Sequence, residues 1–336
     1  PISLAKLLLV VSRALESEKL QQENLGLKRQ AQPVVEPAGK SEIMHALRNQ
    51  ARRIAQHSTW LLINGEPGAG KEVVARYIHA QSSLRDRPFV EVAVGSMSAG
   101  NSAVELFGSE EGERVVYGRL EQANGGTLFL GNISDMDVQT QARLLSVFQT
   151  HSFLRMGGTE AIPVDIRVIA TTARDLEQEV REGRFREDLY YHLNVVPLTV
   201  PPLREHSEDV PELLNFYVDR FVVQEHLPYR EFSIAAQNRL RNYSWPGNNR
   251  ELKNLVQRLL ILGQGPVIDI DEVESVLQQT DESAAPAGSS ATLPLDLPLR
   301  EAREQFEKVY LEHQLQEVGG SVGKLAKRVG MERTHL

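Results

Sequence analysis

The sequence feature that most constrains the fold is a glycine-rich turn between an apolar run and a helical pattern. The run Trp60–Asn64 is typical of a buried strand, Gly65–Glu72 reads GEPGAGKE, and the spacing of apolar residues in Glu72–Ala80 predicts a helix. A strand, a glycine-rich loop and a helix in this order form a phosphate-binding loop. Such a unit is typical of a parallel sheet that helices cover on both faces.

The residues of this loop predict ATP or ADP as the cofactor. Glycines let backbone N–H groups surround a polyphosphate, the helix start adds positive potential, and Lys71 reaches the terminal phosphates. A Ser or Thr usually follows the lysine and holds Mg²⁺, but Glu72 stands there, so Mg²⁺ binding is doubtful. A plain glycine-rich turn without a ligand is the alternative. The nucleotide-binding residues predicted in the loop are Gly65, Gly68, Ala69, Gly70, Lys71 and Glu72.

Composition excludes several classes of function. The 336 residues are 41% hydrophobic and 24% charged, as in ordinary globular proteins, and no apolar run is long enough for a membrane span. The absence of cysteine excludes disulfides, thiolate catalysis and cysteine zinc sites, and it predicts a cytoplasmic protein. A net charge of −8 restricts any DNA contact to a local patch. Because Pro1 rather than Met opens the chain, we expect it to be part of a longer protein.

Apolar and polar patterns divide the chain into regions. Strands are predicted at 60–64, 89–92, 127–130 and 166–170, with helices between them. The predicted regions are an N-terminal helical segment at 1–30, an α/β domain at 41–202, a helical lid at 203–264, a flexible Ser/Ala/Pro/Gly-rich linker at 280–298 and a helical DNA-binding segment at 299–336.

Several sequence blocks resemble the AAA+ domain of NtrC-type activators of sigma-54 RNA polymerase, and they occur in the order of that family. The blocks are GEPGAGKE from Gly65, ELFGSEEG from Glu105, GRLEQANGGTLFL from Gly118, FREDLYYHLNVVPL from Phe185, PPLREHSEDVP from Pro201 and WPGNNREL from Trp245. The resemblance implies an AAA+ P-loop NTPase fold, a three-layer α/β/α domain with an all-helical lid. Relatives also carry a Glu at the position of Glu72.

The two ends of the chain resemble other parts of the same regulators. Residues 1–30 look like the end of a receiver domain followed by a linker helix; its stripe from Leu4 to Leu15 either packs on its own domain or forms a coiled coil. The segment from Gly319 is similar to a Fis-type helix-turn-helix that stops inside its recognition helix. Four cations against one anion make it the predicted DNA-binding patch, unless it is only a solvated basic helix. The predicted DNA-binding residues are Lys324, Lys327, Arg328, Arg333, Thr334 and His335.

The chain departs from the family where hydrolysis takes place. Relatives end their second catalytic strand in Asp-Glu, which hold Mg²⁺ and the attacking water, whereas Gly131 and Asn132 stand here. Two polar helpers align with Ala93 and Ala173. Asp135 and Asp137 lie nearby as possible substitutes, although Asp135 matches a structural family position. No catalytic residue and no metal site are therefore predicted.

The loop with which relatives contact the sigma factor, GAFTGA, is also missing. After Gly112 only Glu113–Tyr117 precede Gly118, so the Phe-Thr pair of the family is absent. A shorter contact loop of another sequence is the alternative.

Part of the nucleotide machinery is retained in sequence. The resemblance makes Arg186 an arginine finger that reaches a neighbouring copy, with His192 at a second finger position, and makes Arg250 the lid arginine that senses phosphate.

The sequence therefore predicts a DNA-binding regulator of a two-component system. Its degenerate AAA+ domain is expected to bind nucleotide without hydrolysing it and not to activate sigma-54 polymerase. The expected partners are DNA, RNA polymerase with an unspecified sigma factor, further copies in a dimer or ring, and a sensor kinase acting through a receiver domain. The alternatives are an active ATPase with an unorthodox site and a nucleotide-free scaffold.

Overall fold

A computed structural model of the protein describes residues 36–96, 102–112 and 114–284. The chain divides into two compact units, residues 1–268 and 269–336. Among the described residues, no helix is both long enough and apolar enough to cross a membrane.

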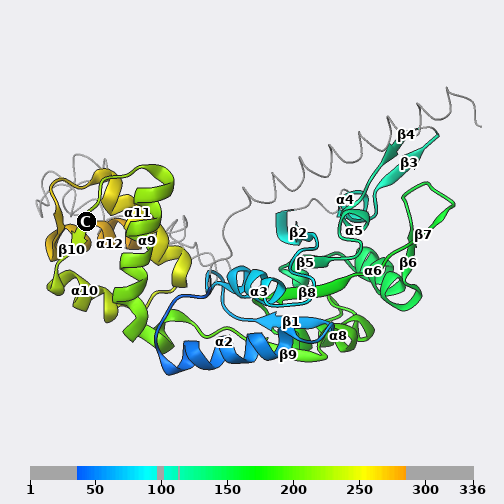
Figure 1. Ribbon diagram of the computed structural model, residues 1–336, viewed down its shortest axis with the longest axis horizontal. Helices are drawn as coiled ribbons and strands as arrows, with labels where there is room; N and C mark the ends of the chain where they lie inside the picture. Colours follow the sequence, from blue (N-terminus) through cyan, green and yellow to red (C-terminus); the bar gives the residue numbers. More distant parts are fainter. Residues whose placement is uncertain (1–35, 97–101, 113, 285–336) are drawn as a thin grey trace, which may run out of the picture. The chain divides into compact units, whose positions relative to one another are not determined.

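The first unit is built around a five-stranded parallel sheet in the order β2-β5-β8-β1-β9 (Figure 1). Its strands are β1 Leu61–Asn64, β2 Phe89–Ala93, β5 Thr127–Gly131, β8 Arg167–Thr172 and β9 Val196–Thr199. The sequence predicted the first four. It did not predict β9, an edge strand that contains Pro197.

Helices cover both faces of this sheet, as the sequence predicted. Leu62 of β1 belongs to the apolar core on one face, whereas its neighbours Leu61 and Ile63 belong to the core on the other. The first core is completed by α4 Ser102–Phe107, α5 Arg119–Gln122, α6 Val138–Thr150, α7 Leu176–Arg181 and α8 Glu187–Leu193. The second core is completed by α2 Glu42–Ala55 and α3 Lys71–Ala80. The short helices η1 Val94–Ser96 and η2 Ile133–Asp135 follow β2 and β5.

Two β-hairpins project from the first unit where the sequence predicted no strands (Figure 1). One pairs β3 Ser109–Glu111 with β4 Arg114–Val116, and the other pairs β6 Ser152–Leu154 with β7 Ala161–Pro163. Backbone hydrogen bonds join them, because Glu110 N donates to Met156 O at 2.9 Å and Met156 N donates to Gly108 O at 3.0 Å. The segment that the sequence analysis predicted to stand in place of the family's contact loop thus contains the paired strands β3 and β4.

A helical lid follows the α/β part of the first unit. It consists of η3 Leu203–Asp209, α9 Val210–Glu225, α10 Ile234–Arg241 and α11 Asn248–Leu262, with a short parallel pair of strands, β10 Glu231–Phe232 and β11 Val267–Ile268. The lid is packed around the fully buried Trp245, whose Nε1 donates to Leu240 O at 2.9 Å. The sequence predicted an all-helical lid and missed the β10–β11 pair.

In the second unit, α12 Ile270–Ala284 is the described element. Its last residues, 280–284, belong to the 280–298 stretch that was predicted as a linker, so the helix ends later than the sequence predicted. The rest of that linker, the 1–30 segment and the 299–336 segment lie outside the described residues.

Candidate nucleotide site

The glycine-rich loop forms the turn between β1 and α3. Gly68 and Gly70 have φ angles of +78° and +99°, in the left-handed region that favours glycine. Gly70 is the N-cap of α3, so the loop directs backbone N–H groups and the positive end of the helix toward one point. A cradle of this kind fits a polyphosphate, and the predicted residues from Gly65 to Glu72 make up this turn and the start of α3.

Lys71 begins α3 and turns back onto the loop. Its Nζ donates to Gly65 O at 2.5 Å and to Glu66 O at 2.9 Å. Burial of the ammonium group, together with the charge of Arg250, lowers the pKa of Lys71 from 10.5 to about 8. The pair of cations predicted for phosphate therefore lies at one end of the loop. Phosphate oxygens would compete with two carbonyl oxygens for Lys71.

The lid contacts the loop through the start of α11. Asn248 is fully buried; its Nδ2 donates to Pro67 O at 3.1 Å and its Oδ1 accepts a hydrogen bond from Leu203 N at 2.9 Å. Asn249 Nδ2 donates to Ala69 O at 3.0 Å, and Arg250 N donates to Gly68 O at 3.3 Å. The WPGNNREL block thus holds the phosphate loop with side chains that the sequence analysis did not single out.

The tightest contact between lid and loop is an ion pair that the sequence analysis also missed. Arg204 of η3 binds both carboxylate oxygens of Glu66, at 2.6 and 2.7 Å. Asn248 Nδ2 also donates to Glu66 Oε2, at 3.0 Å. The hydrogen bonds from Arg204 and Asn248 lower the pKa of Glu66 from 4.5 to about 2.

Glu72 is engaged by its own helix. Its carboxylate binds Arg76 Nε at 2.9 Å, and the guanidinium of Arg76 also pairs with Glu91 and lies over the ring of Phe89. Arg76 thus neutralises the residue that stands where a metal-binding hydroxyl is usual.

The positions that the sequence analysis predicted to differ from those of catalytic relatives lie together at the carboxyl edge of the sheet. Ala93 at the end of β2 pairs in register with Gly131 at the end of β5. Asn132 N donates to Thr171 Oγ1 at 3.1 Å, and Ala173 follows β8 directly. This edge is where ligands bind in open parallel sheets.

The nearby carboxylates are committed to other contacts. Asp135 forms an ion pair with Arg174 at 3.0 Å. Asp137 caps α6 by accepting a hydrogen bond from Thr140 N at 2.9 Å, and it accepts another from Ser102 Oγ at 2.9 Å. Burial opposes ionisation of Asp137, but these hydrogen bonds outweigh it and lower its pKa. Within the described ranges, no group of three or more His, Asp and Glu side chains could hold a metal ion.

A cavity of about 520 Å³ lies beside this edge. It is lined by residues from the β1 end and the loop start, the β8–α7 turn, α8 and β9, including Asn64, Glu66, Arg174, Tyr190, Asn194 and Pro197. Of the phosphate loop, Gly65 and Glu66 line it, and their carbonyl oxygens accept the hydrogen bonds of Lys71 Nζ, so the cavity adjoins the cradle around Lys71.

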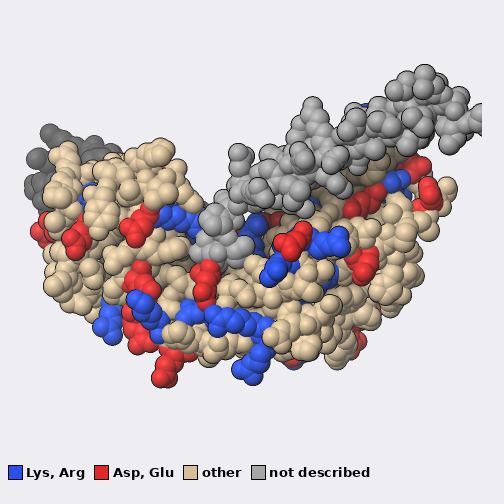
Figure 2. Space-filling model, in the orientation of Figure 1, with Lys and Arg blue, Asp and Glu red and all other residues tan. Residues whose placement is uncertain are grey.

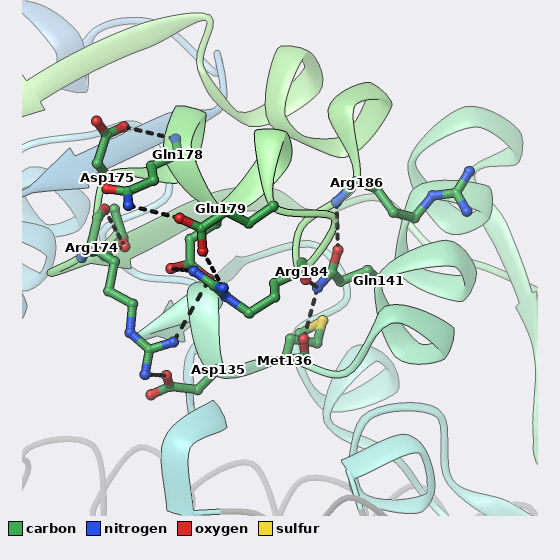
Figure 3. Close-up of polar contacts among 11 residues, drawn as sticks. Asp135, Met136, Gln141, Arg174, Asp175, Gln178, Glu179, Arg184 and Arg186 are labelled. Carbon is green, nitrogen blue, oxygen red and sulfur yellow. Dashed lines mark hydrogen bonds and ion pairs between the residues drawn. The ribbon is translucent and has the colours of Figure 1, made fainter. Parts of the chain in front are cut away.

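Arg186 lies at the N-cap of α8. In this single copy its guanidinium binds Asp188 at 2.7 and 3.0 Å and remains partly exposed. His192, at the second finger position, packs its ring 5.9 Å from Trp60, and its Nδ1 lies 3.0 Å from Asp188 O. Figure 3 shows Arg186 pointing away from the cluster around Glu179 and Arg184, whereas its backbone N lies against Gln141.

Charges of both signs are mixed on the face shown in Figure 2, where basic and acidic side chains alternate over the described part of the chain. This fits a protein whose charged side chains form many ion pairs. The residues predicted to bind DNA, from Lys324 to His335, lie outside the described residues.

Comparison with known proteins places the fold. Residues 38–199 match the Sigma-54 interaction domain, residues 204–290 match the AAA+ ATPase lid domain, and residues 302–336 match the Fis family of bacterial regulatory proteins. NtrX of Azorhizobium caulinodans is 42% identical over 343 residues, covering 100% of this chain and 75% of that protein. NtrC of Azospirillum brasilense is 40% identical over 291 residues, covering 85% of this chain and 60% of that protein. The crystal structure of Brucella abortus NtrX with ADP superposes with a TM-score of 0.73 at 40% identity, covering 100% of this chain and 75% of that one.

The fold and its loop therefore define an AAA+ P-loop NTPase domain with a helical lid, confirming the predicted fold class. The chain belongs to the NtrC/NtrX family of two-component transcriptional regulators. The Fis-family segment confirms the predicted helix-turn-helix type and implies DNA binding. Brucella abortus NtrX has been crystallised with ADP and with ATP.

Proposed function

We propose that this chain is the nucleotide-binding and DNA-binding part of a response regulator whose AAA+ domain binds ATP or ADP without hydrolysing it. In this proposal the domain works as a nucleotide-responsive scaffold for assembly on DNA. It does not remodel sigma-54 polymerase, although it keeps the fold of the Sigma-54 interaction domain.

Retained binding is supported by the loop and its cations. The cradle of Gly65, Gly68, Ala69, Gly70 and Lys71 is intact, and Arg250 lies close enough to depress the pKa of Lys71. These groups bind phosphate through backbone donors and charge, neither of which requires the carboxylates used in hydrolysis. Crystals of a relative with both ADP and ATP add support.

The loss of hydrolysis rests on one observation. At the end of β5, Gly131 offers no ligand and Asn132 cannot accept a proton at neutral pH. Asp135, a nearby carboxylate that could substitute, is held by Arg174 at 3.0 Å. The residues present do not fit a Mg²⁺ ion with its attacking water, so the site lacks the groups that a hydrolytic step requires.

The replacement of the contact loop supports a loss of sigma-54 activation. In place of GAFTGA the chain has the β3–β4 hairpin, whose backbone is bonded to β6–β7. Arg155 strengthens this join because it binds Glu110 at 3.2 Å and Glu121 at 2.7 Å. The hairpin is therefore held at its base. Its sequence also lacks the Phe-Thr pair with which relatives contact the sigma factor.

The remaining partners follow from the family. DNA is contacted by the Fis-type segment, with Lys324, Lys327 and Arg328 at phosphates and Arg333, Thr334 and His335 near base edges. Copies associate as a dimer or ring in which Arg186 reaches the neighbouring nucleotide. A sensor kinase acts through a receiver domain, and residues 1–30 resemble the end of that domain with its linker helix. We keep the domain boundaries 41–202 and 203–264 for the α/β part and the lid.

ATP binding and turnover, measured on one preparation, test the proposal. The expected result is saturable ATP binding that Lys71→Ala abolishes, with no phosphate release above background with Mg²⁺. The matched control, Lys40→Ala, changes an exposed lysine outside the loop and should leave binding unchanged. Robust Mg²⁺-dependent phosphate release, abolished by Lys71→Ala, would favour the alternative of an active ATPase with an unorthodox site. A flat calorimetric titration with ATP and ADP would favour a nucleotide-free scaffold.

A further inference from the structure

One buried side chain, Gln141 of α6, joins the turn after β5 to the loop that carries Arg186. Gln141 is fully buried. Its amide nitrogen donates to Met136 O at 2.7 Å and to Arg184 O at 3.0 Å, and its amide oxygen accepts a hydrogen bond from Arg186 N at 2.8 Å (Figure 3). Because its partners are two carbonyls and one N–H, they fix the orientation of the amide.

A chain of ion pairs runs parallel to this bridge. Asp135, in η2, binds Arg174 at 3.0 Å, and Arg174 lies 3.8 Å from Glu179. The buried Glu179 carboxylate accepts hydrogen bonds from Arg184 at 2.7 and 2.8 Å. These hydrogen bonds from Arg184 lower the pKa of Glu179. Two independent routes therefore connect the same turn with the loop at 184–186.

Simple core packing does not account for Gln141. It shares the buried face of α6 with Leu144, Leu145 and Phe148, where an apolar side chain would fill the space without the cost of burying an amide. The amide is retained in a position where all its described hydrogen bonds go to two loops rather than to its own helix. Both loops border a nucleotide pocket in the proposed assembly. The turn with Met136 follows the β5 edge of this copy's own pocket, and Arg186 faces the pocket of the next copy.

We infer that Gln141 is the positioning residue for Arg186, and that it couples the nucleotide pocket of one copy to the arginine that this copy presents to the next. The coupling rests on the proposed function, namely nucleotide binding and self-association. Gln141 binds the backbone of Arg186 and not its guanidinium. The side chain can therefore leave Asp188 and reach outward while its Cα stays in place.

Two measurements on the whole chain test this inference, using Gln141→Met and Leu144→Ala. Methionine has nearly the volume of glutamine but makes no comparable hydrogen bonds. Leu144 is equally buried on the same helix and contacts the core, so its replacement destabilises the domain without removing the bridge. The first measurement is hydrogen exchange of the Arg186 amide. The second is ATP-induced self-association by analytical ultracentrifugation, with ATP affinity measured on dilute protein.

Gln141→Met should speed exchange of the Arg186 amide about fivefold or more, which corresponds to losing one hydrogen bond. It should weaken ATP-induced association by at least about fivefold while leaving ATP affinity of dilute protein unchanged. Leu144→Ala should leave ATP-induced association unchanged at a temperature where both variants are folded, and it should speed exchange of the Arg186 amide no more than that of the other α8 amides. Unchanged amide exchange in Gln141→Met, or equal effects of the two substitutions, overturns the positioning role. If the unmodified chain fails to bind ATP, the proposed function and the coupling both fail, and amide exchange still decides whether Gln141 positions Arg186.

Discussion

The guanidinium of Arg204 in the lid donates hydrogen bonds to both carboxylate oxygens of Glu66 in the phosphate loop, at 2.6 and 2.7 Å. The two residues are 138 positions apart in the sequence, yet they join the loop that binds phosphate to the domain that closes over it. Together with Asn248, this pair makes the position of the lid depend on the conformation of the loop.

Replacing Arg204 with Ala should lower the free energy of unfolding only slightly at pH 7. The loss should become smaller as the pH falls. Both side chains are more than a third exposed, so the pair contributes at most about 1 kcal/mol. The folded pKa of Glu66, about 2, lies below its ordinary 4.5. The contribution is therefore fully present above pH 4.5 and is lost as pH falls toward 2. Thermal unfolding from pH 7 to pH 3 measures the difference between wild type and Arg204→Ala, which should shrink with falling pH.

Arg204→Lys is the matched control for this prediction, since it keeps the charge but not the two-pronged geometry. It should recover only part of the lost stability. A difference between Arg204→Ala and wild type that stays constant with pH would contradict a role for the Glu66 carboxylate.

ATP affinity should fall as pH rises above 8. The folded pKa of Lys71 is about 8, below its ordinary 10.5, because the ammonium is buried beside Arg250. The charged form therefore costs stability below pH 8, and this cost disappears as pH rises from 8 to 10.5. Phosphate favours the charged form, so ATP binding takes up a proton above pH 8, and affinity drops by up to about tenfold per pH unit. Titrations with a fluorescent nucleotide between pH 7 and 9.5 measure this.

Lys71→Arg provides the control, since an arginine stays charged throughout this range. The ATP affinity of Lys71→Arg should not fall between pH 8 and 9.5, whatever its absolute value. An equal pH dependence in both proteins would place the titrating group elsewhere.

Asp209 should be among the most costly residues to remove. Its buried carboxylate accepts hydrogen bonds from Lys40 N at 2.7 Å, from Ser41 N at 2.8 Å and from Ser41 Oγ at 2.6 Å, and it contacts His206 Nδ1 at 3.0 Å. Burial raises its pKa, but these hydrogen bonds outweigh burial and lower it overall. Asp209→Ala leaves buried donors unpaired and should lower the free energy of unfolding by about 3 kcal/mol. Denaturant unfolding measures this, and the exposed Asp219→Ala should change stability by less than about 0.5 kcal/mol. Equal effects of the two substitutions would refute the role given to Asp209.

Much of the α/β core could be predicted from sequence because its signals are local. The strand at 60–64, the glycine-rich loop and the helix after it are consecutive, and their apolar runs match strands buried on both faces. The edge strand β9 lacks such a run, since Pro197 interrupts it. The strands β3 and β4 have only three residues each, and β3 is entirely polar, so neither is long enough to show a strand pattern.

The contacts that organise the candidate site could not be predicted in the same way. Glu66 and Arg204 are brought together only by the tertiary fold. In the sequence, each of them alone is typical of an exposed charged residue. The sequence does contain a feature that indicates a special role for Gln141. After the α6 cap at Asp137, it occupies a position three and four residues before the buried Leu144 and Leu145, where a polar side chain needs an explanation.

Restoring the two residues of the catalytic strand should return some hydrolysis but not transcription activation. An added Cβ at Gly131 would meet its nearest neighbour, Val92 O, at 3.5 Å, so the Cβ of Gly131→Asp makes only ordinary van der Waals contacts. Asn132 has φ 54° and ψ 59°, in the left-handed region that asparagine tolerates better than glutamate. Asn132→Glu should therefore cost about 1 kcal/mol of stability, measured by denaturant unfolding of the single variant. The double variant should release phosphate slowly with Mg²⁺, since Ala93 and Ala173 still lack the polar groups of relatives.

Transcription should remain silent in this double variant, because hydrolysis alone does not supply a contact with the sigma factor. The β3–β4 hairpin is held at its base by the hydrogen bonds of Met156 with Glu110 and Gly108 and by Arg155, and it carries no Phe-Thr pair. Open-complex formation with sigma-54 polymerase, assayed with the full-length regulator, measures the result. An active relative from the same family serves as the positive control. Activation by the double variant would show that the hairpin at 109–116 works as a contact loop of another sequence, and the assignment of this chain as a non-activating scaffold would then fail.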